Sequence, residues 1–256
     1  MEEKWDFYFA KIDGDIASIF VNLSMEDLAP VPRLTQMVVL RLTMREPRDD
    51  GLSSEDEYAA LSVIDDALYN EICTKQNAVY VGRVTYAGLR DFYYYAADPG
   101  AAGKAAARAM HEIPDYKFEI LSQPDADWST FKNFLLPSPK DRQRMGNREA
   151  SDQLRDSGDP LTEAREIDHW AYFPTPAARD DFVSRTTAIG YKLRNALEPD
   201  PATDNTNHGA QIYRSDIPGS ELFDAITAEL AKLAQECGGS YDGWESPVNE
   251  AKEQPN

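Results

Sequence analysis

Asp168 and His169 are adjacent in the chain and come closest, by residue type, to a pair that could move protons in catalysis. They lie in Glu166–Phe173, a run of residues that predicts a β-strand. Neighbouring side chains of a strand point to opposite faces of the sheet, so these two groups cannot act on each other. We therefore expect His169 to face the core with its hydrogen bonds satisfied, rather than to serve as a catalytic base.

Short motifs with well-known chemistry are absent from the sequence. It contains no HExxH, no paired CxxC, no P-loop, no GxSxG and no GxGxxG. Cys73 and Cys237 lie in segments that look helical and have no CxxC partner, which favours reduced, mostly buried thiols. We predict no catalytic residue, no cofactor and no metal ion. The alternatives are a catalytic cysteine, or a metal held by His169 and His208.

Aromatic and acidic side chains share the face of the strand that His169 does not use. Two further strands, Gly209–Arg214 and Ser240–Glu245, are expected in the same sheet, and the second contributes either Trp244 or Tyr241 to that face. The residues that we predict to contact a partner are Asp168, Trp170, Tyr172, Tyr213, Asp242, Trp244 and Glu245.

Three interpretations of this face stay open. The first half of the chain or a second copy can cover it. It can bind another protein, because aromatic residues are enriched at interfaces. Its rings can also stack on RNA bases, as in four-stranded RNA-recognition sheets, but that use needs basic residues around the rings. The neighbouring strand supplies only Lys192 and Arg194, so a protein partner is favoured over RNA.

The chain is acidic along its whole length. Its 256 residues include 26 Lys plus Arg and 45 Asp plus Glu, a formal net charge of −19, and neither half carries the surplus alone. This charge disfavours non-specific binding to nucleic acid and to anionic membranes, whose phosphates repel it. No secretory signal and no apolar run of about 18 residues is visible in the sequence. We expect a cytoplasmic protein with a basic partner.

The order of predicted elements indicates an α+β fold in two domains. Residues 1–137 begin with a β-hairpin, in which Phe7 and Phe9 alternate with polar residues. They continue as strand, helix, strand, strand, helix, strand, which is the split β-α-β arrangement. The first helix opens at a capping box, with Asp65 and Asp66 facing outward. Its inner face is predicted from the spacing of Tyr58, Leu61, Ile64, Leu68 and Ile72.

The second half of the chain repeats this order of elements. Residues 138–158 are highly charged and are predicted to form a helical linker. Residues 159–247 read strand, helix, strand, strand, helix, strand, so we predict a ferredoxin-like α/β sandwich. Residues 248–256 are polar and are predicted to fray.

Residues of the second half resemble a known family of inhibitors, the regulator of ribonuclease E activity B. The most specific feature is the ending Tyr241-Asp242-Gly243-Trp244. The other matching features are Gly158-Asp159, Glu166-Ile167-Asp168-His169-Trp170-x-x-Phe173, Phe182 and Gly190-Tyr191. The resemblance implies a non-catalytic regulator, since members of that family are acidic proteins that bind ribonuclease E and restrain RNA decay.

Residues 1–135 resemble a second family, the domain of unknown function 695, which is often fused to that inhibitor domain. The features that carry the resemblance are Trp5, Gly51-Leu52, Gly82-Arg83-Val84-Thr85, Gly88-Leu89-Arg90 and Phe92-x-x-Tyr95. This resemblance implies no known activity. The extra domain can redirect or cover the binding face of the inhibitor domain.

We predict a non-catalytic, acidic regulatory protein that binds a basic region of a ribonuclease of the ribonuclease E type and occludes it. No direct contact with nucleic acid or a membrane is expected, and the oligomeric state is left open. One alternative is an antidote for another basic nuclease or toxin. The other is an enzyme or small-ligand binder with a site in the cleft between the domains.

Overall fold

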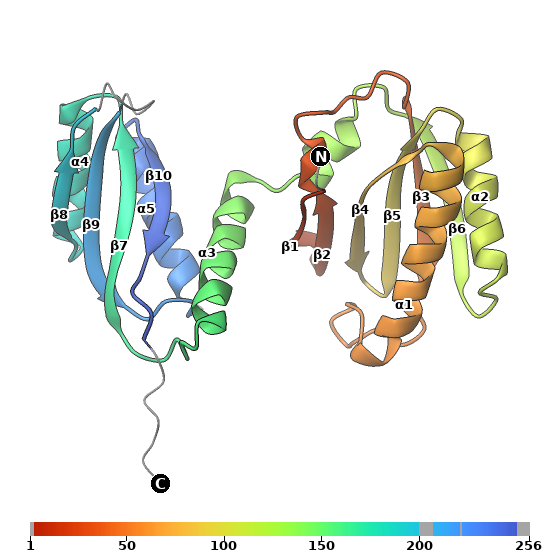
Figure 1. Ribbon diagram of the computed structural model, residues 1–256, viewed down its shortest axis with the longest axis horizontal. Coiled ribbons are helices and arrows are strands. Elements are labelled where there is room, and N and C mark those ends of the chain that lie inside the picture. The colour runs from red at the N-terminus through yellow and green to blue at the C-terminus, as the bar shows by residue number, and fades with distance from the viewer. Residues whose placement is uncertain (1–2, 200–206, 221, 250–256) are drawn as a thin grey trace, which may run out of the picture. The chain divides into compact units, whose positions relative to one another are not determined.

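The computed structural model of the chain describes residues 3–199, 207–220 and 222–249. The chain forms two compact units that divide between Ser138 and Pro139. Each unit is built on one antiparallel sheet with helices packed against it (Figure 1). The predicted α+β fold with two domains is therefore confirmed. In the described part of the chain, no helix is both long and apolar enough to cross a membrane.

The first unit contains a six-stranded sheet with the strand order β1-β2-β4-β5-β3-β6. The last four strands of that order have the predicted split β-α-β arrangement, and the β1–β2 hairpin extends the sheet beyond β4. The strands are β1 (Trp5–Ile12), β2 (Asp15–Asn22), β3 (Gln36–Thr43), β4 (Val79–Tyr86), β5 (Leu89–Ala96) and β6 (Lys117–Pro124). A short 3-10 helix, η1 (Leu23–Met25), follows the hairpin.

Helices α1 (Glu55–Leu68) and α2 (Pro99–His111) pack on one face of this sheet. As predicted, α1 begins after Ser54, whose hydroxyl accepts from the backbone N–H of Glu57 at 3.3 Å. A π-helical turn, η2 (Tyr69–Thr74), continues α1. The prediction for the inner face was wrong at one position, because Tyr58 is 69% exposed and Glu57 is buried. The Glu57 carboxylate satisfies two backbone N–H groups just after β3, at 2.8 and 3.1 Å.

The other face of the first sheet packs against the segment that includes η3 (Phe131–Leu135), a single π-helical turn. Trp128 stacks on Tyr95 with 3.9 Å between ring centroids, and its indole N–H donates to the Leu34 carbonyl at 2.7 Å. The Tyr95 hydroxyl donates to Asp125 at 2.6 Å. These polar groups are satisfied inside the protein, so a core that contains Trp and Tyr carries no orphaned donor at this point.

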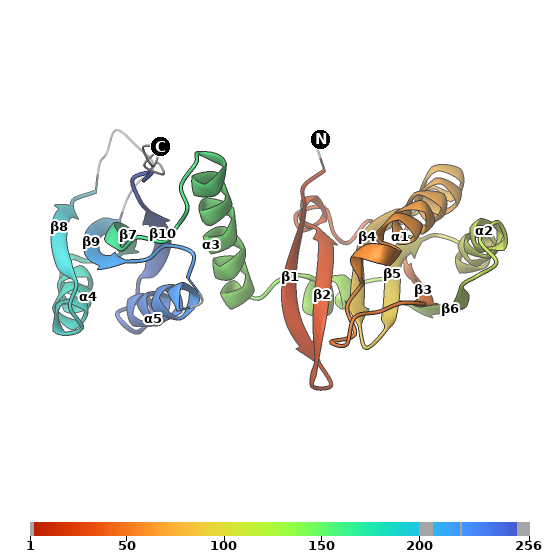
Figure 2. The same cartoon turned by 90° about the horizontal axis from the view of Figure 1, so that it is seen from below.

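The second unit contains a four-stranded sheet with the order β10-β7-β9-β8. Numbered along this half, the order is 4-1-3-2, as expected for the predicted ferredoxin-like sandwich. Its strands are β7 (Arg165–Phe173), β8 (Lys192–Leu197), β9 (His208–Asp216) and β10 (Ser240–Glu245). Helices α4 (Pro176–Ala188) and α5 (Phe223–Glu236) lie on the same face of this sheet (Figure 2).

The charged segment that we expected to act as a linker is helix α3 (Pro139–Asp156), which packs on α5 and β10 within the second unit. Its buried side chains include Met145, Leu154 and Asn147. The Asn147 amide donates to Asp224 and Thr227 at 2.7 and 2.8 Å. Two apolar residues, Met145 and Leu154, and the hydrogen-bonded Asn147 therefore help to attach this highly charged helix.

The predicted fraying end of the chain is described only up to Asn249. The backbone N–H of Asn249 donates to the carboxylate of Asp159 at 2.8 Å. Residues 250–256 lie outside the described part of the chain.

Candidate functional site

Strand β7 positions the residues that we predicted to contact a partner. Its burial alternates along the strand, with His169 fully buried and Asp168, Trp170 and Tyr172 half-buried on the opposite face. In the register with β9, Asp168 lies opposite Tyr213. The structure therefore brings these four predicted residues together on the face that α4 and α5 do not cover (Figure 2).

Tyr172 lies against strand β9 at Gly209. A Cβ atom at position 209 would stand 3.1 Å from the Tyr172 ring and 3.0 Å from the side chain of Leu197. These distances are shorter than ordinary carbon contacts, so the bare backbone at position 209 lets the ring lie close to the sheet. The ring is thereby held in a defined place on the open face.

A β-bulge in β10 determines which residues of that strand reach the open face. The register shifts between Tyr241 and Gly243, and Gly243 has a φ of 147°, which favours glycine. Because of the bulge, both Tyr241 and Trp244 lie on the helix side of the sheet. The expectation that one of them joins the open face was wrong. Glu245 lies opposite Asp168, and Asp242 is exposed within the bulge.

Trp244 is a packing residue of the second unit. Its ring meets Phe223 of α5 edge-on at 4.7 Å, and its indole N–H donates to Asn147 of α3 at 3.0 Å. It thus joins α3, α5 and β10 rather than contributing to the predicted contact surface.

Arg194 changes the charge of the open face. Its guanidinium bonds to Asp168 at 2.5 Å and to Glu166 at 2.7 Å, and it lies 4.1 Å from the centroid of the Tyr213 ring. These carboxylates raise its pKa, the bond to Glu166 having the larger effect. Lys192 of β8 adds a second positive charge 5.9 Å from the centroid of the same ring, so two cations offset the two carboxylates and the half of the face beside β8 is close to neutral. From the sequence we considered Arg194 only as a basic residue that could favour RNA binding, and we did not include Glu166 among the contact residues. The spacing of two residues between Glu166 and Asp168 already indicated that both lie on the same face of the strand.

The other half of the face, beside β10, keeps its negative charge. Asp242 and Glu245 are exposed and make no ion pair with any residue that the structure describes. In the register with β7, Tyr241 pairs with Ala171 and Gly243 with Trp170, so Asp242 lies in the bulge beside these residues. Loss of hydration, and then the charge of Asp242, raise the pKa of Tyr172. We call the group Trp170, Tyr172, Asp242 and Glu245 the aromatic–acidic surface.

His169 does not form part of that surface. Its Nδ1 lies 2.8 Å from the Tyr241 hydroxyl, whereas its Nε2 is buried without a partner, so the expectation of fully satisfied hydrogen bonds was wrong. Burial, and then the charge of Arg214, lower its pKa to about 3. The ring is therefore neutral at physiological pH and cannot exchange protons with Asp168 on the other face.

The second histidine considered as a metal ligand, His208, bonds to Glu198 at 2.8 Å. Among the described residues, no group of three or more His, Cys, Asp or Glu side chains is arranged to hold a metal ion.

Comparison with known families gives two matches that follow the division of the chain. Residues 3–136 match the model of a family of unknown function, DUF695. Residues 144–246 match the model of the regulator of ribonuclease activity B. No curated protein matches the chain.

Solved structures offer distant similarities. An unknown protein from Galdieria sulphuraria is 12% identical over 81% of this chain and 96% of that chain, with a TM-score of 0.22. A putative glycine cleavage system transcriptional repressor is 7% identical over 83% of this chain and 98% of that chain, with a TM-score of 0.26. Neither similarity bears on what this chain does.

Proposed function

The chain belongs to the DUF695 family and carries a second region that matches a family of ribonuclease regulators, and on that premise we propose that it is a non-catalytic inhibitor of a ribonuclease. In this proposal it acts in the cytoplasm, where it binds a basic region of a nuclease of the ribonuclease E type. Binding occludes the region through which the nuclease holds RNA, and RNA decay slows.

The observation that carries the proposal is the aromatic–acidic surface of the second unit. Trp170 and Tyr172 present half-buried rings, and Asp242 and Glu245 are exposed carboxylates at their side. Arginine side chains stack on aromatic rings and pair with carboxylates, so a basic polypeptide segment fits this combination. Aromatic residues also contribute more than most residue types to binding energy at protein interfaces.

Charge assigns different roles to the two halves of the open face. The net charge of −19 attracts a basic partner from a distance and raises the rate of encounter. Asp168 is already paired with Arg194, which also covers the ring of Tyr213. We therefore assign the direct contact to the aromatic–acidic surface, and a supporting role to Asp168 and Tyr213.

A binding experiment with purified ribonuclease E and the full chain tests this assignment. We expect binding at low salt that weakens at high salt, because exposed charges are screened. The double substitution Trp170→Ala, Tyr172→Ala should weaken binding about thirtyfold, which corresponds to ~2 kcal/mol. No binding by the wild-type chain at low salt would remove ribonuclease E as the partner.

Two matched variants separate local contact from overall charge. Glu245→Lys changes the aromatic–acidic surface, and Glu229→Lys makes the same change at an exposed position on α5, which packs on the opposite face of the sheet. Glu245→Lys should weaken binding about tenfold at low salt and less at high salt. Glu229→Lys should have a small effect. Equal losses in both variants would show that net charge, and not this surface, determines binding.

The double variant Trp170→Ala, Tyr172→Ala also distinguishes the inhibitor from the alternative function, an antidote for another nuclease. A chain that does not bind ribonuclease E but binds another basic nuclease through Trp170 and Tyr172 acts as an antidote to that nuclease. RNA cleavage by each nuclease, measured with and without the wild-type chain and the double variant, decides between these two functions.

A further inference from the structure

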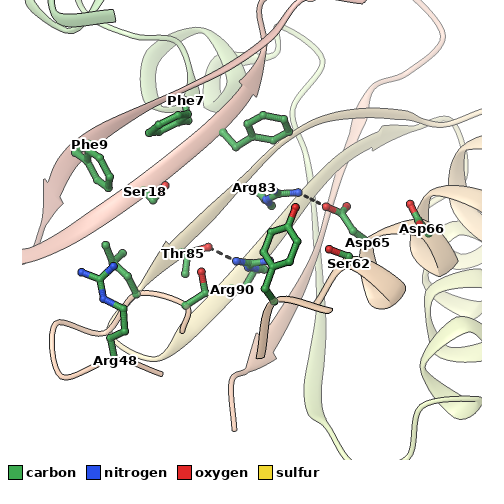
Figure 3. A pocket seen from close by; sticks show the side chains of 14 residues that line it. Phe7, Phe9, Ser18, Arg48, Ser62, Asp65, Asp66, Arg83, Thr85 and Arg90 are labelled. Carbon is green, nitrogen blue, oxygen red and sulfur yellow. Dashed lines mark hydrogen bonds and ion pairs between the residues drawn. The ribbon is translucent and has the colours of Figure 1, made fainter. Parts of the chain in front are cut away.

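A pocket of about 470 Å³ opens within the first unit, on the sheet face that carries α1 and α2. The helices cover β3 and β5, but the β1–β2 hairpin extends the sheet beyond them. The space between α1 and the hairpin is the pocket, and Figure 3 shows Phe7 and Phe9 at one side, Asp65 at the other, and Arg83 and Arg90 between them. Its volume lies within the range of small-molecule sites.

Arg90 lies in the lining of this pocket as a buried cation to which none of the described carboxylates is bonded. The residue is 8% exposed, and its one hydrogen bond to a described residue is from Nε to the hydroxyl of Thr85 at 3.1 Å. Its two terminal nitrogens bond to none of the described residues, and it forms no ion pair with them. Loss of hydration, and then the charge of Arg83, lower its pKa to about 10. A buried charge is normally paired, so this one indicates a missing anion.

The other charged groups of the pocket have partners or lie in solvent. Arg83 pairs with Asp65 of α1, which corrects the expectation that Asp65 faces outward. Arg48 is exposed and pairs with Asp50. Asp66 is exposed. Arg90 is therefore the one arginine of the lining to which no described carboxylate is bonded, and an anionic group of a ligand would supply that partner.

Aromatic side chains line the pocket on the side of the hairpin and at α1. Phe7 and Phe9 are 36% and 50% exposed, and their rings meet edge-on at 5.7 Å. Tyr58 of α1 is another exposed ring in the lining. Large exposed aromatic rings around a cavity are typical of ligand sites, because a flat apolar group can bury them.

We propose that this pocket binds a small organic anion, in which one carboxylate or phosphate group pairs with Arg90 and a flat apolar ring packs against Phe7, Phe9 and Tyr58. The two terminal nitrogens of a guanidinium can hold both oxygens of such a group. The site is separate from the nuclease-binding surface of the second unit, so it adds ligand binding to the proposed function and does not depend on it.

Titration calorimetry of the full chain tests the proposal with four probes. Benzoate and phenyl phosphate carry both parts of the ligand, inorganic phosphate carries the anion alone, and benzyl alcohol carries the ring alone. We expect benzoate, phenyl phosphate or both to bind at least tenfold more tightly than the other two. Tight binding by only one of them distinguishes a carboxylate ligand from a phosphate ligand. No binding by either at millimolar concentration would overturn the proposal.

Variants show whether the probe occupies this pocket. Arg90→Met should abolish binding, and Phe9→Ala should weaken it several-fold while leaving inorganic phosphate unaffected. Arg108→Met is the control, because Arg108 is an exposed arginine of α2 that pairs with Glu71 outside the pocket. A folded Arg90→Met variant that binds as tightly as the wild type would overturn the proposal. So would equal losses in the Arg90 and Arg108 variants.

Discussion

Replacement of Arg90 by methionine should leave the first unit at least as stable as the wild type, whereas Arg41→Met should destabilise it. Both arginines belong to the same sheet, but their partners differ. Arg41 bonds to both oxygens of Asp91, at 2.9 and 2.7 Å. Among the described residues, Arg90 bonds only to Thr85, through its hydroxyl. Arg41 thus has a bonded carboxylate, whereas Arg90 has none among the described residues.

The expected size of each effect follows from these contacts. Burial lowers the pKa of Arg90 from 12.5 to about 10, which corresponds to a cost of about 3 kcal/mol for keeping the charge in the folded state. Because the folded pKa lies below the unfolded one, the full cost is present at neutral pH and stability recovers only as the pH rises above about 10. Methionine removes this cost and loses one hydrogen bond of about 1 kcal/mol. The net expectation is a gain of about 1–3 kcal/mol.

Arg41→Met should lower the free energy of unfolding, because it leaves the carboxylate of Asp91, which is 1% exposed, without its guanidinium partner. Removing one partner of a buried ion pair costs about 3–5 kcal/mol. We expect the lower end of that range, since the Arg41 side chain is 33% exposed and water can reach the space that it leaves.

Hydrogen exchange followed by mass spectrometry on the full chain measures both effects. Peptides from β3 and β5 report the unfolding free energy of the first unit without interference from the second. A loss of more than about 1 kcal/mol in Arg90→Met would refute the reasoning, because it would show that the charge stabilises the fold. An Arg41→Met variant as stable as the wild type would refute it as well.

Further predictions concern the second unit. Asp159→Asn should cost about 3 kcal/mol at neutral pH, because the buried Arg165 loses its counter-charge at 2.6 Å. The difference in stability between the variant and the wild type should shrink in acid. Because the pKa of Asp159 is lowered in the folded state, the wild type loses the stabilisation by this carboxylate as the pH falls below 3.8. Urea denaturation at several pH values measures this change. His169, with a pKa lowered from 6.5 to about 3, should make the wild type lose about 1.4 kcal/mol of stability per pH unit as the pH falls from 6.5 towards 3. His169→Phe should remove that slope in the same denaturation series, and an unchanged slope would assign it to another group. Trp244→Phe should cost about 1 kcal/mol by losing its bond to Asn147. It should leave ribonuclease E affinity unchanged in the binding assay, and a large loss of affinity would return Trp244 to the contact surface.

The alternation of side chains along a β-strand predicted most residues of the candidate surface correctly. Alternation alone separates His169 from Asp168, Trp170 and Tyr172, and the structure agrees at every position of β7. The same argument failed on β10, because the bulge at Gly243 turns Trp244 toward the helices. A bulge adds one residue to one strand and reverses the parity of all residues beyond it. An Asp-Gly pair signals a turn or a bulge, but it does not say which face the next residue takes.

The pocket of the first unit was not visible in the sequence. Phe7 and Phe9 alternate with polar residues, which is typical of a buried face, yet Tyr8 is the buried residue of this strand. The Tyr8 hydroxyl donates to the carbonyl of Leu135, a residue far along the chain. Which face of a hairpin is covered depends on segments that arrive from elsewhere, so local pattern cannot decide it.

The sequence by itself determined the two α+β units, the order of their strands and helices, and the acidic charge of both. These properties depend on local periodicity, capping residues and composition, which act over a few neighbouring residues. Only the tertiary structure decided the partners of the charges. It paired Arg194 with Asp168 across strands and left Arg90 without a carboxylate. Ion pairing requires charged groups within about 4 Å of each other. Asp168 and Arg194 meet at such a distance although they are 26 positions apart in the chain, so only the pairing of the strands could bring them together.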